Sequence, residues 1–371
     1  MEYIRVSNLR SLSDSTRIEI KPLNLLVGAN SSGKSTFLRT FPLLKQSHEM
    51  RTLGGLTLNE GDVDFGFFNE ALHRHANPAE LRLEFGFPLK HSVFKGASLN
   101  NYLLETFDAS CELTYVKRSK DPRYPRLRVA RLTLRTATSL DAVSISADED
   151  GAISELKVNG FLASSDERAL LKLQIARGVI PQLILSVTRS GDGGSPLVLV
   201  ERGTTPFDKR LLAETSTLFH GRTSEETRLA TLQSVEIGSP SKMLENMART
   251  GGSFWRERVS RWTVESSPYK DLRNLLIART LTNVLDSVNL YVNQMAKSIF
   301  YFQPNRATAQ RDYLSRDVSV ASVDSSGANV AIARKFARDS QEPLPTMDAY
   351  LFRLRDLPSK RRRWSSRSAT N

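Results

Sequence analysis

Only one cysteine, Cys111, occurs among the 371 residues, so no internal disulfide can form and a reducing compartment is indicated. No apolar run approaches the roughly 18–20 residues that a membrane-spanning helix needs. The N-terminus also lacks the apolar segment of a secretory signal, and the chain contains no internal repeat. These absences argue against a disulfide-stabilised secreted domain and a membrane-spanning protein, and they predict a cytoplasmic protein.

The composition is that of a globular protein, but the positive charge is unevenly distributed. Apolar residues make up 40% and charged residues 25%, which argues against a mainly disordered or a fibrous chain. Residues 351–371 hold seven cations and one anion, and thus half of the net charge of +12. Such a basic segment favours contact with nucleic acid or anionic surfaces, yet a solvated chain end has the same composition.

The first fifty residues predict short strands, a tight turn and a helix. Residues 3–6 and 17–21 alternate apolar with polar side chains as strands do, and the apolar run 23–27 predicts a buried strand. A Gly/Ser-rich turn follows at residues 28–33. Pro42 is expected to bend or break the subsequent helix early. The apolar residues at helical spacing are Phe37, Leu38, Phe41 and Leu44.

Alternation with a period of two over residues 80–160 predicts an antiparallel sheet of several strands. The sheet is expected to end near residues 198–200, after a Gly/Pro turn. Beyond Pro206 the apolar spacing becomes helical, most clearly over residues 270–299. The turn sequences that separate the predicted strands are Asp121-Pro122, residues 148–151 and Asn159-Gly160.

Residues 28–35, with the sequence GANSSGKS, fit the pattern G-x-x-x-x-G-K-[ST] of a phosphate-binding loop, or P-loop. The predicted strand before the loop and the predicted helix after it are the context that this chemistry needs. The alternative is a Gly/Ser-rich turn with a chance lysine. No N-K-x-D sequence for reading guanine occurs in the chain, which argues against a GTPase.

Each residue of the loop has an expected role in binding a nucleoside triphosphate with Mg²⁺. The glycines let the backbone curl so that successive N–H groups point at phosphate oxygens. Lys34 is expected to reach the β- and γ-phosphates, Ser35 to ligate Mg²⁺, and Thr36 to donate to the α-phosphate. The remaining nucleotide-binding residues expected in the loop are Asn30, Ser31, Ser32 and Gly33.

The N-terminal sequence, VSNLRSL at 6–12 and IEIKPLNLLVGANSSGKST at 18–36, resembles ABC-type ATPases of the structural-maintenance-of-chromosomes and recombination-repair kind. More closely, it resembles bacterial AAA-family ATPases of the AAA-15/AAA-21-like group. The resemblance implies an α/β P-loop NTPase fold of ABC-ATPase type, with an antiparallel β lobe and a helical lobe. It also implies bound ATP and Mg²⁺, a homodimer or higher oligomer formed through nucleotide, and work in DNA repair or antiphage defence with DNA or a nuclease as partner.

The resemblance assigns Arg10, within the N-L-R-S element, to the bound nucleotide, whereas an exposed strand-end arginine is the alternative. Gln46 lies too close to the loop to be identified as the glutamine that couples Mg²⁺ to the helical lobe. Weaker similarity continues in four short blocks at 42–47, 63–68, 301–306 and 324–329.

The sequence elements expected for hydrolysis are missing. No apolar strand ending in Asp-Glu (Walker B) occurs: Asp148-Glu149 follows the alternating run Ser-Ile-Ser-Ala and is expected in a turn, and Asp166-Glu167 follows two serines. The sequence Ser325-Ser326-Gly327 is only faintly similar to a signature loop. Catalytic residues are therefore unassigned. A truncated chain with an incomplete core sheet is therefore expected. Its predicted parts are the P-loop and β lobe at 1–206, a helical lobe at 207–300, the start of a C-terminal lobe at 301–356 and a disordered basic tail at 357–371.

Two further clusters have plainer explanations. His73 and His75 resemble metal ligands, but no Cys, Asp or Glu completes a site at a recognisable spacing, so two partly exposed histidines are expected. Trp255 and Trp262 lie among arginines and suit a nucleic-acid surface, although at helical spacing they are expected to pack against the helical lobe. Two alternatives to an ATPase stay open: a nucleotide-binding switch without hydrolysis, and a non-functional remnant.

Overall fold

The computed structural model describes residues 1–50, 55–89, 104–117, 127–136, 141–175, 179–185 and 205–301. Met1–Ile299 form one compact unit, and Phe300–Asn371 belong to a second. Several predicted features lie outside the described residues: the Asp121-Pro122 turn, the end of the sheet near 198–200, the block at 324–329 and the basic tail. None of the described helices has the length and apolar character needed to cross a bilayer.

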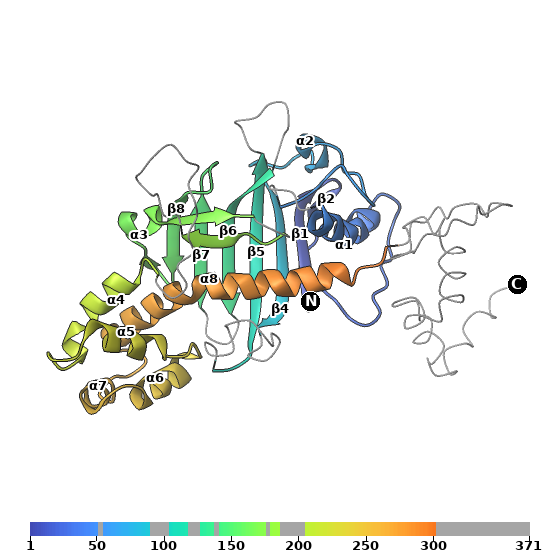
Figure 1. The fold of residues 1–371 in the computed structure, drawn as a ribbon. Coiled ribbons are helices and arrows are strands. Elements are labelled where there is room, and N and C mark those ends of the chain that lie inside the picture. Colours follow the sequence, from blue (N-terminus) through green and yellow to red (C-terminus); the bar gives the residue numbers. More distant parts are fainter. Residues whose placement is uncertain are drawn as a thin grey trace, which may run out of the picture. The chain divides into compact units, whose positions relative to one another are not determined.

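An antiparallel sheet forms the centre of the first unit, as the alternation over residues 80–160 predicts (Figure 1). Its nine described strands have the order β2-β1-β4-β5-β6-β7-β8-β9, and β3 also pairs with β1. The turns predicted at 148–151 and at Asn159-Gly160 join β7 to β8 and β8 to β9. The strands are β1 (Tyr3–Leu9), β2 (Leu12–Asp14), β3 (Ile18–Glu19), β4 (Leu81–Leu89), β5 (Phe107–Lys117), β6 (Leu127–Thr136), β7 (Ala142–Ala147), β8 (Ile153–Val158) and β9 (Phe161–Leu162).

Helices gather at the two ends of the sheet, and α8 joins them. Figure 1 shows α8, the helix predicted at 270–299, crossing the sheet from the α4–α7 helices to α1. A separate ribbon of β10 (Leu171–Gln174) and β11 (Gln182–Leu185) lies against α8. The helices are α1 (Lys34–Glu49), α2 (Phe68–Ala71), α3 (Ser165–Ala169), α4 (Asp208–Glu214), α5 (Glu225–Gln233), α6 (Pro240–Arg249), α7 (Ser253–Val259) and α8 (Ser267–Lys297), with a 3-10 turn at Ser216–Leu218.

The core lies between one face of the sheet and α8. Alternate residues of β4, Leu81, Leu83 and Phe85, are at most 1% exposed, because successive side chains of a strand point to opposite faces. The Phe87 ring of β4 lies 5.4 Å from the Tyr291 ring of α8. The apolar spacing of these elements therefore places the buried face as the sequence predicts.

The helix that follows the Gly/Ser turn does not break at Pro42, so this part of the expectation is wrong. α1 runs for 16 residues with Pro42 inside it. Proline removes one backbone donor and opposes helix continuation, but here Pro42, Leu43 and Leu44 are all buried. Burial of this apolar group, on a helix that contacts α8, outweighs the local cost of the proline.

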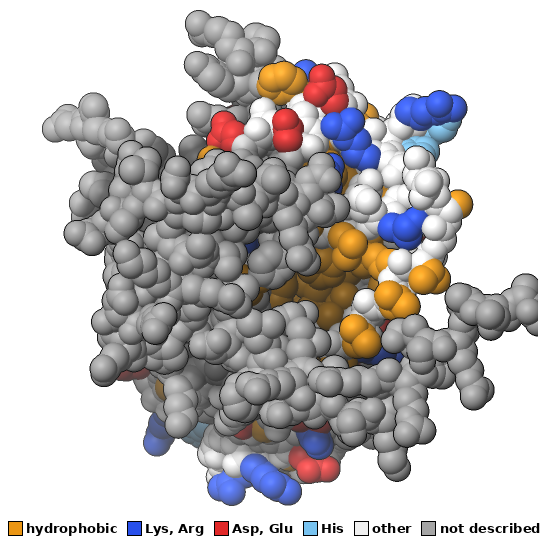
Figure 2. Space-filling view, turned by 90° about the vertical axis from the view of Figure 1, so that its right-hand side faces the viewer, with side chains coloured by type: hydrophobic (Ala, Val, Ile, Leu, Met, Phe, Trp, Pro, Cys, Tyr) orange, Lys and Arg blue, Asp and Glu red, His pale blue; other side chains and the backbone are white. Residues whose placement is uncertain are grey.

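The apolar run at 23–27 is not a buried strand, and this expectation is wrong as well. Leu23, Leu25 and Val27 are 77%, 82% and 80% exposed, and none of the described strands pairs with them. A strand interior needs neighbours on its edges and its faces, and the described residues provide neither. Figure 2 shows hydrophobic side chains at the surface on the side of the molecule where α1 lies.

A polar substitution in this run should therefore cost little stability. We expect Leu25→Ser to change the free energy of unfolding by less than about 0.5 kcal/mol, because its side chain is already in water. Binding of the dye ANS should fall, since exposed apolar surface decreases. Leu83→Ser is the matched control: this leucine is 0% exposed, and its loss should cost about 3 kcal/mol or more in urea unfolding. Equal losses for the two variants would contradict the exposure of the run.

Candidate phosphate-binding site

The loop at residues 28–33 is tightly curled. Gly28, Ser31 and Gly33 have φ angles of 151°, 64° and 93°, in the region that residues with a Cβ atom rarely adopt. A Cβ on Gly33 would lie 2.5 Å from Cδ2 of Leu12, so a larger residue here would require the Leu12 side chain of β2 to shift. This glycine thus allows both the backbone conformation and the approach of the loop to the sheet.

Helix α1 begins directly after the loop and presents unpaired backbone donors. Its first bonded amide belongs to Phe37, which donates to the Gly33 carbonyl over 2.8 Å. The N–H groups of Ser35 and Thr36 have no acceptor within the described residues, and no side chain caps the helix. The first turn contains no acidic residue. Free donors and the positive end of the helix dipole make this end suited to an anion.

The Lys34 ammonium group lies across the loop. It donates to the carbonyls of Gly28 and Ala29 over 2.8 and 2.5 Å, and lies 3.4 Å from the Ser32 hydroxyl. The lysine side chain thus reaches back over the loop from residue 34 to residues 28 and 29. An anion in the loop would offer stronger, charge-assisted partners than these neutral carbonyls.

Arg10 comes to this site from the β1–β2 hairpin. Its φ is 49°, and its backbone N–H donates to the Ala71 carbonyl over 2.7 Å. Its Nη2 donates to the Phe65 carbonyl over 2.8 Å, and the neighbouring Ser11 hydroxyl lies 3.1 Å from that of Thr36. The hairpin therefore connects the first turn of α1 with the segment around Phe65.

An ion pair supports the hairpin that carries Arg10. Arg5 of β1 donates from Nε to the Asp14 carboxylate of β2 over 2.9 Å, and its Nη2 lies 2.5 Å from the second oxygen. These hydrogen bonds from Arg5 lower the pKa of Asp14 to about 2. The carboxylate is thus charged, and the pair is made, at neutral pH.

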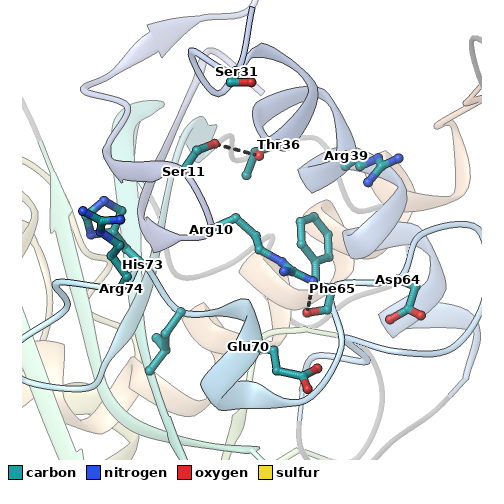
Figure 3. A pocket seen from close by; sticks show the side chains of 11 residues that line it. Arg10, Ser11, Ser31, Thr36, Arg39, Asp64, Phe65, Glu70, His73 and Arg74 are labelled. Atoms are coloured by element: carbon teal, nitrogen blue, oxygen red, sulfur yellow. Dashed lines mark hydrogen bonds between the residues drawn. The ribbon is translucent and has the colours of Figure 1, made fainter.

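A cavity of about 690 Å³ opens beside the loop (Figure 3). It lies between the hairpin, the first turns of α1 and the segment 64–74, and Figure 3 shows Arg10 near its centre. This volume is in the range of pockets for drug-sized ligands. The lining residues are Arg10, Ser11, Ser31, Thr36, Arg39, Asp64, Phe65, Glu70, Leu72, His73 and Arg74.

The charged side chains of the cavity favour an anionic ligand. Its carboxylates are tied to the wall itself: Asp64 accepts from the N–H of Gly66 over 2.6 Å, and Glu70 accepts from that of Phe67 over 3.0 Å. The three arginines of the lining have no ion-pair partner among the described residues. They are Arg10, Arg39 and Arg74.

Some of the nucleotide-binding residues predicted from the sequence line the cavity, and the others lie beside it. Arg10, Ser31 and Thr36 line it, whereas Asn30, Ser32, Gly33, Lys34 and Ser35 belong to the adjoining loop and first helical turn. Sequence reasoning missed Arg39, Asp64, Glu70 and Arg74 as lining residues. The only sequence signals near these residues are the weakly similar block at 63–68 and the two histidines at 73 and 75.

The histidine and tryptophan clusters lie in different places: His73 lines the cavity, whereas Trp255 is buried among the helices. His73 is partly exposed and His75 is exposed, with their rings 5.6 Å apart, and no group of three or more potential ligands among the described residues suits a metal ion. Trp255 is 1% exposed and donates from Nε1 to the Met247 carbonyl, so it packs within the helices as expected. Glu167 begins α3 in a capping box with Ser164 rather than ending an apolar strand.

Comparison with known proteins supports a nucleotide-binding ATPase over the first part of the chain. Residues 1–133 match the family model described as AAA ATPase domain (AAA_15). This match covers the loop, the hairpin and the complete lining of the cavity. No curated protein matches the chain.

Proposed function

We propose that this protein binds ATP with Mg²⁺, with the triphosphate in the loop at residues 28–33 and the nucleoside in the adjoining cavity. The proposal rests on the observation that the loop and the cavity adjoin each other. Ser31 of the loop and Thr36 at the start of α1 both line the cavity. A ligand that extends from the loop into the cavity therefore has a phosphate end at free amides and a second part beside Arg10.

The residues of the loop fit a magnesium-bound triphosphate. The Ser35 hydroxyl is exposed at the first turn of α1 and has no hydrogen-bond partner within the described residues, so it is available as an oxygen ligand. When bound, Mg²⁺ neutralises part of the phosphate charge. Lys34 exchanges the carbonyls of Gly28 and Ala29 for phosphate oxygens, and the amides of Ser35 and Thr36 donate to the same anion.

On the strength of the N-terminal resemblance, we propose an ABC-type ATPase that acts in DNA repair or antiphage defence. Such a protein forms a homodimer or higher oligomer through nucleotide and works with DNA or a nuclease. The alternative is a nucleotide-binding switch that does not hydrolyse ATP, and it is favoured by the lack of a Walker B sequence in the chain.

Calorimetry and steady-state turnover test the proposal together. Titration of the purified full chain with ATP should show saturable binding in the presence of Mg²⁺ and weaker binding with EDTA. Phosphate release that depends on Lys34 supports the ATPase, whereas binding without turnover supports the switch. A chain that shows no saturable ATP binding at millimolar concentrations contradicts both.

A further inference from the structure

We propose that Gln46 is a positioning residue that fixes the wall of the cavity against the phosphate-binding helix and thereby determines how well the nucleoside part of the ligand is held. This inference rests on the proposed function, because it concerns the same site. Gln46 does not line the cavity itself. Its effect passes through the loop that carries Asp64 and Phe65.

Gln46 is buried and makes three hydrogen bonds to the backbone of one loop. Its side chain is near the end of α1 and is only 3% exposed. The amide nitrogen donates to the carbonyls of Thr57 and Val63 over 2.6 and 3.0 Å, and the amide oxygen accepts from the Val63 N–H over 3.0 Å. One side chain thus holds both ends of the loop 57–63.

Ser47 and Gly61 also contribute to the close fit between α1 and the loop 57–63. The Ser47 hydroxyl, also buried, accepts from the Thr57 N–H over 2.9 Å and donates to the Leu43 carbonyl. Gly61 has a φ of 105°, and a Cβ there would lie 3.0 Å from the amide oxygen of Gln46. The loop therefore fits closely around this one side chain, and shifts in either are transmitted to the other.

The held loop leads directly into the cavity wall. Asp64 and Phe65 follow Val63 without a break, and both line the cavity. The Phe65 N–H donates to the Leu58 carbonyl over 2.7 Å, and its own carbonyl accepts from Arg10. Because α1 also carries Thr36 at its other end, one helix positions both the phosphate site and the wall opposite it.

The difference between ATP and inorganic tripolyphosphate measures the contribution of the wall. Both ligands, each with Mg²⁺, contact the loop at residues 28–33, but only ATP has a nucleoside for the cavity. For Gln46→Leu, which keeps the volume and removes the three hydrogen bonds, we expect ATP binding to weaken at least about tenfold. Tripolyphosphate binding should change by less than about twofold, since the loop amides and Lys34 are retained.

Two smaller changes and a control complete the experiment. Ser47→Ala and Gly61→Ala disturb the same loop from other sides, so each should weaken ATP selectively if Gln46→Leu does not fold. Thr215→Val is the matched control for Ser47→Ala, because its buried hydroxyl also donates to the carbonyl four residues earlier but lies in the α4 region. It should leave the ratio of the two affinities unchanged.

The outcomes separate the inference from the function on which it rests. Wild-type protein that binds neither ligand refutes the proposed function. Wild-type protein that binds both ligands equally well, or variants that weaken both by the same factor, refute the role of Gln46. Selective loss of ATP affinity in the Gln46, Ser47 or Gly61 variants, with Thr215→Val unaffected, supports it.

Discussion

Replacing Lys34 by alanine should weaken the binding of ATP with Mg²⁺ by at least about 100-fold. Charge-assisted hydrogen bonds to phosphate contribute more than neutral ones, and the loss of about 3 kcal/mol corresponds to a factor of this size. The measurement is calorimetric titration of the full chain. Because the Lys34 side chain only contacts neutral groups of the loop in the absence of ligand, the thermal midpoint should change little.

Lys21→Ala is the matched control for this change. It removes the same charge from an exposed lysine a short distance earlier in the chain, where the ammonium group pairs with Glu19 at 2.8 Å. Surface pairs of this kind contribute little to stability, and general attraction of anions is reduced equally in both variants. A similar loss of ATP affinity in the two variants would show that overall charge, rather than the loop, accounts for binding.

The curl of the loop, the helix after it and most strands of the sheet follow from short-range rules and are predictable from the sequence. Alternation predicts β4 and the neighbouring strands. The glycines at 28 and 33 predict a curl because glycine readily adopts the positive φ angles that the structure shows there. The helix after the loop and the long helix α8 follow from apolar spacing. Each of these predictions needs only residues that are close in the sequence.

The errors at Pro42 and at residues 23–27 have a common physical origin. Propensity disfavours a helix through Pro42, yet contact with α8, more than 200 residues away, keeps the helix intact. An apolar run favours burial, yet whether Leu25 is buried depends on strands that pair with it, and none of the described strands does. Tertiary context decided both cases, in opposite directions.

The cavity is less predictable than the loop because it is assembled from separate segments. Arg10 comes from a hairpin, Arg39 from α1 and Arg74 from the chain after α2, and nothing in their spacing connects them. Gln46 is harder still, since it acts on backbone groups, which leave no trace in the identity of the residues they belong to. Only coordinates show that its partners adjoin the cavity wall.

The largest effect on stability is expected at a buried ion pair that joins α8 to the sheet. Arg273 of α8 donates from Nη1 and Nη2 to the two oxygens of Asp141, at 2.5 and 2.6 Å, and its Nη2 lies 3.2 Å from the Gly238 carbonyl. The side chains of Arg273 and Asp141 are only 6% and 12% exposed. Asn159 in the turn after β8 also donates to this carboxylate.

Asp141→Ala should therefore lower the free energy of unfolding by about 3–5 kcal/mol, because it leaves the Arg273 charge buried without its carboxylate. Urea unfolding measures this, with Asp271→Ala as control: that aspartate is exposed on the same helix, and its loss should cost less than about 0.5 kcal/mol. Adding Arg273→Met to Asp141→Ala should recover part of the stability, since the uncompensated charge is then removed. A double variant that is less stable than Asp141→Ala alone would mean that Arg273 stabilises the helix through its other contacts rather than through the pair.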